Sequence, residues 1–251
     1  MAESGSRWTR EELLLTLNLY HRIPFSKYDQ RTPEVMAVAA LIGRTPSAVA
    51  YQLSNFAALD DNLAQRGFSN YSKTDAAIWE EFRIRSDEMV IETEEARRRL
   101  GTDSLIAEAE ADLPTTISGT EREVLTKIRV NQAYFRRLIL SRYEATCCIT
   151  GLRVRELLVA AHIVPWASEP ASRMDPSNGL CLNSLHDRAF ECGLVVIDDD
   201  YRVRVSARLR DAEGGPAVDF LRESDGRLLQ LPARVLPGRD FLRRHRERFV
   251  G

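Results

Sequence analysis

A chain of 251 residues is long enough for one large domain or for two ordinary domains with separate hydrophobic cores. Its hydrophobic content of 44% and charged content of 29% are typical of a globular protein, and no apolar run is long enough to span a membrane. The formal net charge of −2 combines −6 on residues 1–112 with +4 on residues 113–251, so it neither supports nor excludes a polyanionic partner.

Residues 7–82 have the pattern of a helical domain. Apolar residues recur at helical spacing after the capping residue Thr9, at Leu13, Leu14, Leu17 and Tyr20. A second helix is expected from Pro33 to the stop at Gly43, and a third begins at Pro46. Helix, short glycine-containing turn and helix is the order of a helix-turn-helix motif.

The stretches "RWTREEL" and "LIGRTPSAVAYQLSNF" resemble the first helix and the turn plus recognition helix of Myb-like or homeodomain-like helix-turn-helix proteins. This resemblance implies that residues 1–86 form a DNA-recognition domain; the alternative is a three-helix module that binds protein. The polar groups that would contact bases are Ser47, Tyr51, Gln52 and Asn55. This helix contains no Lys or Arg, so phosphate contacts would come from Arg44, Lys73, Arg83 or Arg85.

Residues 87–118 are predicted to link two domains, first as a helix with solvated charges and then as a flexible acidic connector. From Thr120 a long helix is expected, with apolar residues at helical spacing and arginines between them. Arg136, Arg137 and Arg142 are candidate contacts to a DNA backbone, and a solvated helix face is the alternative.

After Gly151 the pattern changes to short strands, which makes the whole chain α+β. One apolar strand ends on His162, a polar loop leads to Asn178, and a short helix carries His186. A hairpin with "DDD" as its turn follows.

Strand, His, loop, Asn, helix and His is an order that resembles the HNH endonuclease family, with its ββα-metal finger. The stretches "AAHIVPW", "DPSNGLCL" and "LHDRAFECGL" carry the resemblance. The preceding helix and the tail "LPGRDFLRRHRERF" are similar to those of HNH restriction endonucleases, especially the modification-dependent ones. The resemblance implies an HNH nuclease domain over residues 119–251.

The chemistry of phosphodiester cleavage suits these residue types. A neutral histidine can take a proton from water at cellular pH, so His162 is the predicted general base. The resemblance implies that Asn178 holds the loop of His162 and that His186 binds a divalent cation, Mg²⁺ or Mn²⁺. Ala161 stands where many HNH enzymes have a metal-binding Asp or His, so the second ligand would be Asn178, Asp175 or Asp187.

Four cysteines lie in this half of the chain: Cys147, Cys148, Cys181 and Cys192. They lack the paired C-x2-C spacing of a zinc site, and the N-terminus lacks the apolar core of a signal peptide. We therefore expect a cytoplasmic location, reduced thiols and no structural zinc.

The sequence thus predicts a metal-dependent endonuclease that cleaves double-stranded DNA in prokaryotic restriction, with 5-methyl- or 5-hydroxymethylcytosine as a candidate trigger. Two cuts per duplex and one finger per chain favour a homodimer. The alternatives are a DNA-binding regulator with an inactive finger, and a nonspecific nuclease or toxin whose N-terminal part binds a protein.

Overall fold

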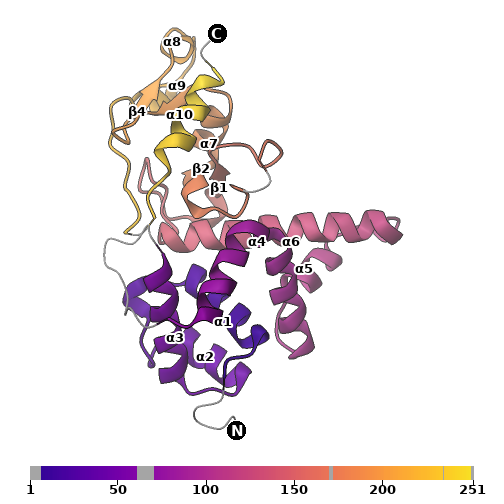
Figure 1. Cartoon of the computed structure of the whole chain (residues 1–251). Helices are drawn as coiled ribbons and strands as arrows, with labels where there is room; N and C mark the ends of the chain where they lie inside the picture. The colour runs from indigo at the N-terminus through magenta and orange to yellow at the C-terminus, as the bar shows by residue number, and fades with distance from the viewer. Residues whose placement is uncertain (1–6, 61–70, 170–171, 234, 250–251) are drawn as a thin grey trace. The chain divides into compact units, whose positions relative to one another are not determined.

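A computed structural model describes residues 7–60, 71–169, 172–233 and 235–249 (Figure 1). The chain divides into two compact units, residues 1–138 and 139–251. Helices predominate in the first unit, and the second adds two small antiparallel sheets, so the predicted α+β class is confirmed. In the described ranges, no helix is both long and apolar enough to cross a membrane.

The first unit begins with helix α1 (Arg10–Arg22), which starts where the capping pattern predicts. The Thr9 side chain accepts a hydrogen bond from the Glu12 backbone N–H, and the Glu12 carboxylate accepts one from the Thr9 N–H at 2.7 Å. This reciprocal pair satisfies two of the N–H groups that a helix start leaves unpaired.

Two further helices follow the short 3-10 helix η1 (Phe25–Lys27): α2 (Pro33–Ile42) and α3 (Pro46–Leu59). Gly43 ends α2 in the left-handed region, with φ of 69°, which a residue with a side chain rarely adopts. Thr45 then caps α3. The predicted order of helix, glycine turn and helix is therefore present.

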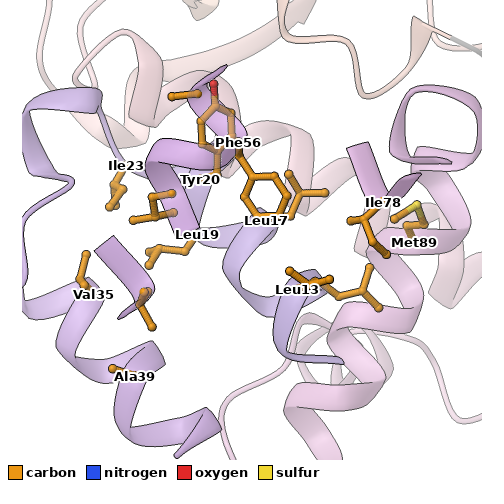
Figure 2. Packing of buried hydrophobic residues seen from close by; sticks show 14 residues of the cluster. Leu13, Leu17, Leu19, Tyr20, Ile23, Val35, Ala39, Phe56, Ile78 and Met89 are labelled. Atoms are coloured by element: carbon orange, nitrogen blue, oxygen red, sulfur yellow. The ribbon is translucent and has the colours of Figure 1, made fainter. Parts of the chain in front are cut away.

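Buried side chains from α1, α2, α3 and α4 (Lys73–Arg99) form the hydrophobic core of the first unit (Figure 2). Tyr20 and Phe56 are its largest members, and the Tyr20 hydroxyl donates a hydrogen bond to the Asp60 carboxylate at 2.6 Å. Both rings are at most 1% exposed, so they belong to the core and are not open to a ligand.

The predicted domain boundaries at 86 and 118 differ from the observed division. Helix α4 continues through residue 86, with a kink at Arg85, and places Met89 in the core of the first unit. The expected flexible connector is instead helix α5 (Leu105–Ala111), because the buried Glu94 carboxylate accepts a hydrogen bond from the Leu105 N–H at 2.7 Å. Helix α6 (Gly119–Arg142) follows and matches the predicted long helix.

The second unit contains the strands β1 (Leu158–His162) and β2 (Gly179–Asn183), which pair antiparallel, and the pair β3 (Val195–Ile197) and β4 (Val203–Val205). Its helices are η2 (Arg155–Leu157), η4 (Pro176–Asn178), α7 (Ser184–Glu191), α8 (Ala207–Arg210), α9 (Pro216–Arg222) and α10 (Arg239–Glu247). Residues 147–154, between α6 and η2, form turns and irregular structure.

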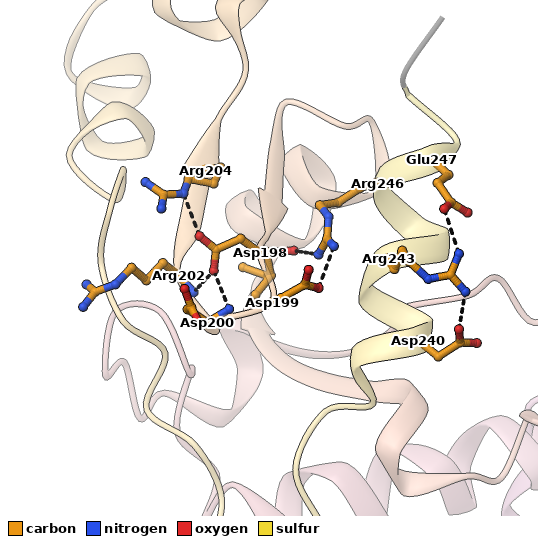
Figure 3. Close-up of polar contacts among 10 residues, drawn as sticks. Asp198, Asp199, Asp200, Arg202, Arg204, Asp240, Arg243, Arg246 and Glu247 are labelled. Atoms are coloured by element: carbon orange, nitrogen blue, oxygen red, sulfur yellow. Dashed lines mark hydrogen bonds and ion pairs between the residues drawn. The ribbon is translucent and has the colours of Figure 1, made fainter.

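The acidic turn between β3 and β4 is a structural element (Figure 3). The Asp198 carboxylate accepts hydrogen bonds from the backbone N–H of Asp200 and Arg202 and from the Arg204 guanidinium at 2.8–3.0 Å. The Arg246 side chain of α10 donates to the Ile197 carbonyl, which ties α10 to this hairpin.

Candidate active site

The β1–β2 ladder and helix α7 form a ββα unit. The Cα pairs of the ladder run from Leu158–Asn183 at one end to His162–Gly179 at the other. Asn183 ends β2 and caps α7, because its Oδ1 accepts a hydrogen bond from the His186 backbone N–H at 2.9 Å. Helix α7 packs against both strands. His162 and His186 thus belong to one small structural unit.

The ring of His162 is held in one orientation. Its Nε2 lies 2.9 Å from the Arg173 carbonyl oxygen, and its ring meets Trp166 edge-on with centroids 5.3 Å apart. A carbonyl oxygen only accepts hydrogen bonds, so Nε2 carries the proton and Nδ1 carries the lone pair. Burial lowers the pKa of His162 more than the bond to Arg173 raises it. At neutral pH this residue is therefore a neutral imidazole with its acceptor atom at Nδ1.

Asn178 braces the backbone that follows His162. Its Oδ1 accepts a hydrogen bond from the Val164 N–H at 2.8 Å, and its Nδ2 donates to the carbonyls of Val164 and Ser172 at 3.2 Å each. Its own carbonyl accepts from the Ile163 N–H at 3.0 Å. Asn178 is 1% exposed, so these bonds replace water completely.

His186 is fully buried and meets Phe220 of α9 edge-on, with ring centroids 5.1 Å apart. Its Nδ1 lies 3.0 Å from Nδ2 of Asn183 and 3.3 Å from Oδ1 of the same amide. Nδ1 can accept from Nδ2 in one tautomer of the ring and donate to Oδ1 in the other. Nε2 is buried without a hydrogen-bond partner among the described residues. Burial, and then the charge of Arg227, lower the pKa of His186 to about 4.

The pairing of Asn178 and His186 on one metal ion stays a prediction. Asn178 adjoins the Gly179 end of the ladder, and His186 lies in the first turn of the helix that Asn183 caps. Both amide atoms of Asn178 already bond to the loop. A metal bond at His186 Nε2 requires the tautomer with the proton on Nδ1, from which it can donate to Oδ1 of Asn183.

No other ligand set replaces that pair. Among the described residues, no three His, Cys, Asp or Glu side chains lie close enough together to hold a metal ion. Ala161 is buried in the ladder opposite Leu180, and the Asp175 carboxylate bonds to Ser177. Asp187 is half-buried, and its pKa is raised mainly by burial and further by the negative charge of Glu191. The described residues therefore do not fit a complete metal site as they are arranged.

The C-terminal helix supports the loop after His162, a connection that no local sequence pattern indicates. The Arg244 guanidinium of α10 bonds to the Glu169 carboxylate at 2.9 Å, and this carboxylate also accepts from the Ser172 hydroxyl at 3.0 Å. The Gly238 N–H donates to the Ser177 carbonyl at 2.8 Å. His245 of α10 is buried and stacks on Phe190 with ring centroids 3.7 Å apart.

Two of the four residues predicted to read bases on α3 are buried. Gln52 is 2% exposed and donates from Nε2 to the Asp75 carboxylate at 2.8 Å, and Asn55 is 5% exposed and donates to the Gln52 carbonyl at 3.3 Å. Both amides face the interior of the first unit, where Asp75 of α4 accepts from Gln52 and Gln52 accepts from Asn55. Ser47 and Tyr51 of α3 are exposed.

Arg44 is likewise a structural residue. Its guanidinium forms an ion pair with Glu12 at 2.8 Å and lies 4.9 Å above the Trp8 ring centre. Only 8% of the Arg44 side chain is exposed. Its predicted contact with a DNA phosphate is therefore not supported, because the carboxylate of Glu12 already takes the place that a phosphate would fill.

The arginines predicted on α6 have different surroundings. Arg136 and Arg137 are half-buried in the first unit, and Arg137 bonds to both oxygens of the Glu108 carboxylate at 2.8 and 2.9 Å. Arg142, in the second unit, lines a cavity. A DNA contact by Arg137 would have to displace Glu108.

An antiparallel hairpin followed by a helix, with a histidine at the strand end braced by a buried asparagine, defines a ββα nuclease finger. Residues 147–198 match the HNH endonuclease family, and this segment contains His162, Asn178 and His186. No curated protein matches the chain. The chain therefore carries an HNH endonuclease domain and is a DNA-cleaving phosphodiester hydrolase. HNH nucleases generally use a divalent metal ion.

Proposed function

We propose that His162 is the general base of this endonuclease and acts through Nδ1. The observation that supports this is the hydrogen bond from Nε2 to the Arg173 carbonyl, which leaves the lone pair on the other ring nitrogen. The lowered pKa of His162 keeps the imidazole unprotonated at neutral pH. Both properties are those of a base that takes a proton from water.

In the proposed reaction, Nδ1 of His162 removes a proton from a water molecule as the water oxygen attacks phosphorus. The new P–O bond forms as the bond to the departing 3′ oxygen breaks, and that oxygen takes a proton from solvent. The Arg173 carbonyl keeps its hydrogen bond to Nε2–H and stabilises the imidazolium that forms. Asn178 contributes by holding the backbone after His162 in place.

A divalent cation, Mg²⁺ or Mn²⁺, would stabilise charge on the phosphate. The family match supports a role for this ion, although the described residues form no complete ligand set for it. Cleavage assays with Mg²⁺, with Mn²⁺ and with a chelator test this requirement.

The test of the base is plasmid cleavage by His162→Ala and His162→Gln. Glutamine retains a donor for the Arg173 carbonyl but has no basic nitrogen. Both variants should lose about 10²- to 10⁴-fold in cleavage rate, with unchanged melting for the glutamine variant. Wild-type activity in His162→Gln would show that the residue only supports the loop.

We further propose that this nuclease acts in the cytoplasm as a prokaryotic restriction enzyme, dependent on cytosine modification, and cuts duplex DNA as a homodimer. The likeness of its C-terminal half to modification-dependent HNH enzymes supports this. Matched unmodified, methylated and hydroxymethylated plasmids should be cut at different rates, and sedimentation with duplex DNA should show two chains per complex. Complete inactivity on every plasmid and metal would instead favour a DNA-binding regulator with an inactive finger.

A further inference from the structure

A cavity of about 300 Å³ lies in the second unit, apart from the residues of the proposed reaction. Its walls come from the end of α6 with the turn that follows, from Arg153, and from residues 230–233, which follow α9. The lining residues are Arg142, Tyr143, Glu144, Thr146, Arg153, Gln230, Leu231, Pro232 and Ala233.

The lining of this cavity carries a net positive charge. Arg142 and Arg153 contribute two guanidinium groups, and Glu144 contributes one carboxylate. Arg153 is exposed and has no ion pair or hydrogen bond from its side chain within the described part of the chain. The arginines of α10 differ, since Arg243 and Arg246 are bonded to carboxylates (Figure 3).

The backbone at the rim of the cavity is held in an unusual conformation. Glu144 and Ala145 have φ of 50° and 48°, in the left-handed region that residues with side chains rarely adopt. The Ala145 N–H donates to the Leu140 carbonyl at 2.7 Å, and the Thr146 N–H donates to the Tyr143 carbonyl at 2.9 Å. Backbone strain of this kind is concentrated at ligand-binding sites.

A hydrogen bond from a lining residue connects the cavity to the end of the ladder that carries His162. The Tyr143 hydroxyl donates to the Gly179 carbonyl at 3.4 Å, and Gly179 is the ladder partner of His162. The chain that leaves the cavity after Ala233 reaches Gly238, whose N–H bonds to the Ser177 carbonyl. A DNA strand lying across this end of the hairpin would therefore pass close to the cavity.

We propose that this cavity binds a backbone phosphodiester group of the DNA substrate, near the one that is cut. The proposal rests on the proposed nuclease function and adds a subsite to it. Two guanidinium groups are suited to a phosphate. A flipped base is less well matched, because the Tyr143 side chain is 6% exposed and its hydroxyl is bonded, so its ring is not available for stacking.

The test uses duplex binding by the full chain in a chelator, so that cleavage does not interfere. Arg153→Ala should weaken binding about 3- to 10-fold and reduce the slope of log affinity against log salt by about one. Glu144→Gln should tighten binding, because it removes the carboxylate from the cavity. Arg208→Ala, an exposed charge on α8 outside the cavity, is the matched control and should change binding less than Arg153→Ala.

Equal effects of Arg153→Ala and Arg208→Ala would overturn the subsite, since general charge attraction would then explain both. A change in preference for one base, in place of a uniform loss of affinity, would overturn the assignment of the ligand as a phosphate. Failure of the nuclease function gives a different result, because wild-type protein would then cleave no DNA with any metal, whatever the cavity variants do to binding.

Discussion

Helices α3 and α7 both carry polar residues that the sequence assigns to work on DNA, and the structure buries Gln52 and Asn55 on α3 and His186 on α7. On α3, the Gln52 amide bonds to Asp75 of the same unit, and Oδ1 of the neighbouring Asn55 is buried without a partner among the described residues. On α7, His186 has a partner for one ring nitrogen, and its buried Nε2 has none among the described residues. Folding alone accounts for a buried polar group that is fully bonded, whereas a buried unpartnered nitrogen requires another explanation.

The same contrast applies to the loops beside these helices. Arg44, next to α3, is occupied by Glu12, so the loop contributes stability. Beside β1, the loop after His162 uses its hydrogen bonds to fix a ring whose remaining nitrogen is an acceptor. A site for chemistry therefore differs from a packed interior in how its hydrogen bonds orient a titratable ring.

The largest expected effect is on stability at low pH. The pKa values of His186 and His245 in the folded protein are about 4, against 6.5 for a free histidine. The stability that the two neutral histidines contribute is fully present above pH 6.5 and is lost as the pH falls toward 4. The reason is that each histidine takes up a proton at a higher pH in the unfolded chain than in the folded protein. Lowering the pH from 7 to 5 should therefore reduce the free energy of unfolding by about 2 kcal/mol for each of these two histidines.

Hydrogen exchange of α7 and α10 in the full chain measures this loss. In His245→Phe, which keeps the stack on Phe190, the pH dependence should fall to about half. Equal protection of these helices at pH 7 and pH 5 would show that neither histidine is as buried in solution as in the structure.

Asn178→Ala should have the next largest effect. It leaves the buried N–H and carbonyl of Val164 without their partners, at a cost of roughly 2–4 kcal/mol in unfolding free energy. Denaturant unfolding gives the stability, and plasmid cleavage below the melting temperature gives the activity. Ser177→Ala, in the same loop, is the control and should cost at most about 1 kcal/mol. A stable Asn178→Ala protein with full activity would contradict the bracing role.

A pair of variants on α3 separates structural from binding residues in the first unit. Gln52→Ala should lower the unfolding free energy by about 1–3 kcal/mol, because it leaves the buried Asp75 carboxylate short of a donor. Tyr51→Ala changes a side chain that is 50% exposed, so it should cost no more than about 0.5 kcal/mol while weakening duplex binding. Weaker duplex binding without a loss of stability in Gln52→Ala would instead show that Gln52 contacts a base directly.

Arg244→Ala should have the smallest effect on stability. The Arg244 and Glu169 side chains are about one-third exposed, so their ion pair is worth at most about 1 kcal/mol. The cleavage rate should nevertheless fall a few-fold with KM unchanged, since Glu169 also holds Ser172 of the loop. Arg243→Ala, also on α10, is the matched control and should leave the rate unchanged.

Local rules in the sequence determined much of this protein. Thr9 with Glu12 set the start of α1, Gly43 ended α2, and apolar spacing indicated α6 and the strand that ends at His162. The order of His162, Asn178 and His186 with their flanking residues indicated the HNH domain. These signals act over a few residues or depend on residue order, so they can be read without a three-dimensional structure.

Only the tertiary structure decided how the side chains are used. Glu12 lies 32 residues from Arg44, Asp75 lies 23 from Gln52, and Glu169 lies 75 from Arg244. The carbonyl of Arg173, which sets the tautomer of His162, is a backbone group that every residue possesses, so no residue type marks it. The division of the chain after residue 138 likewise arises from packing, because a continuous helix gives no sign of where one core ends.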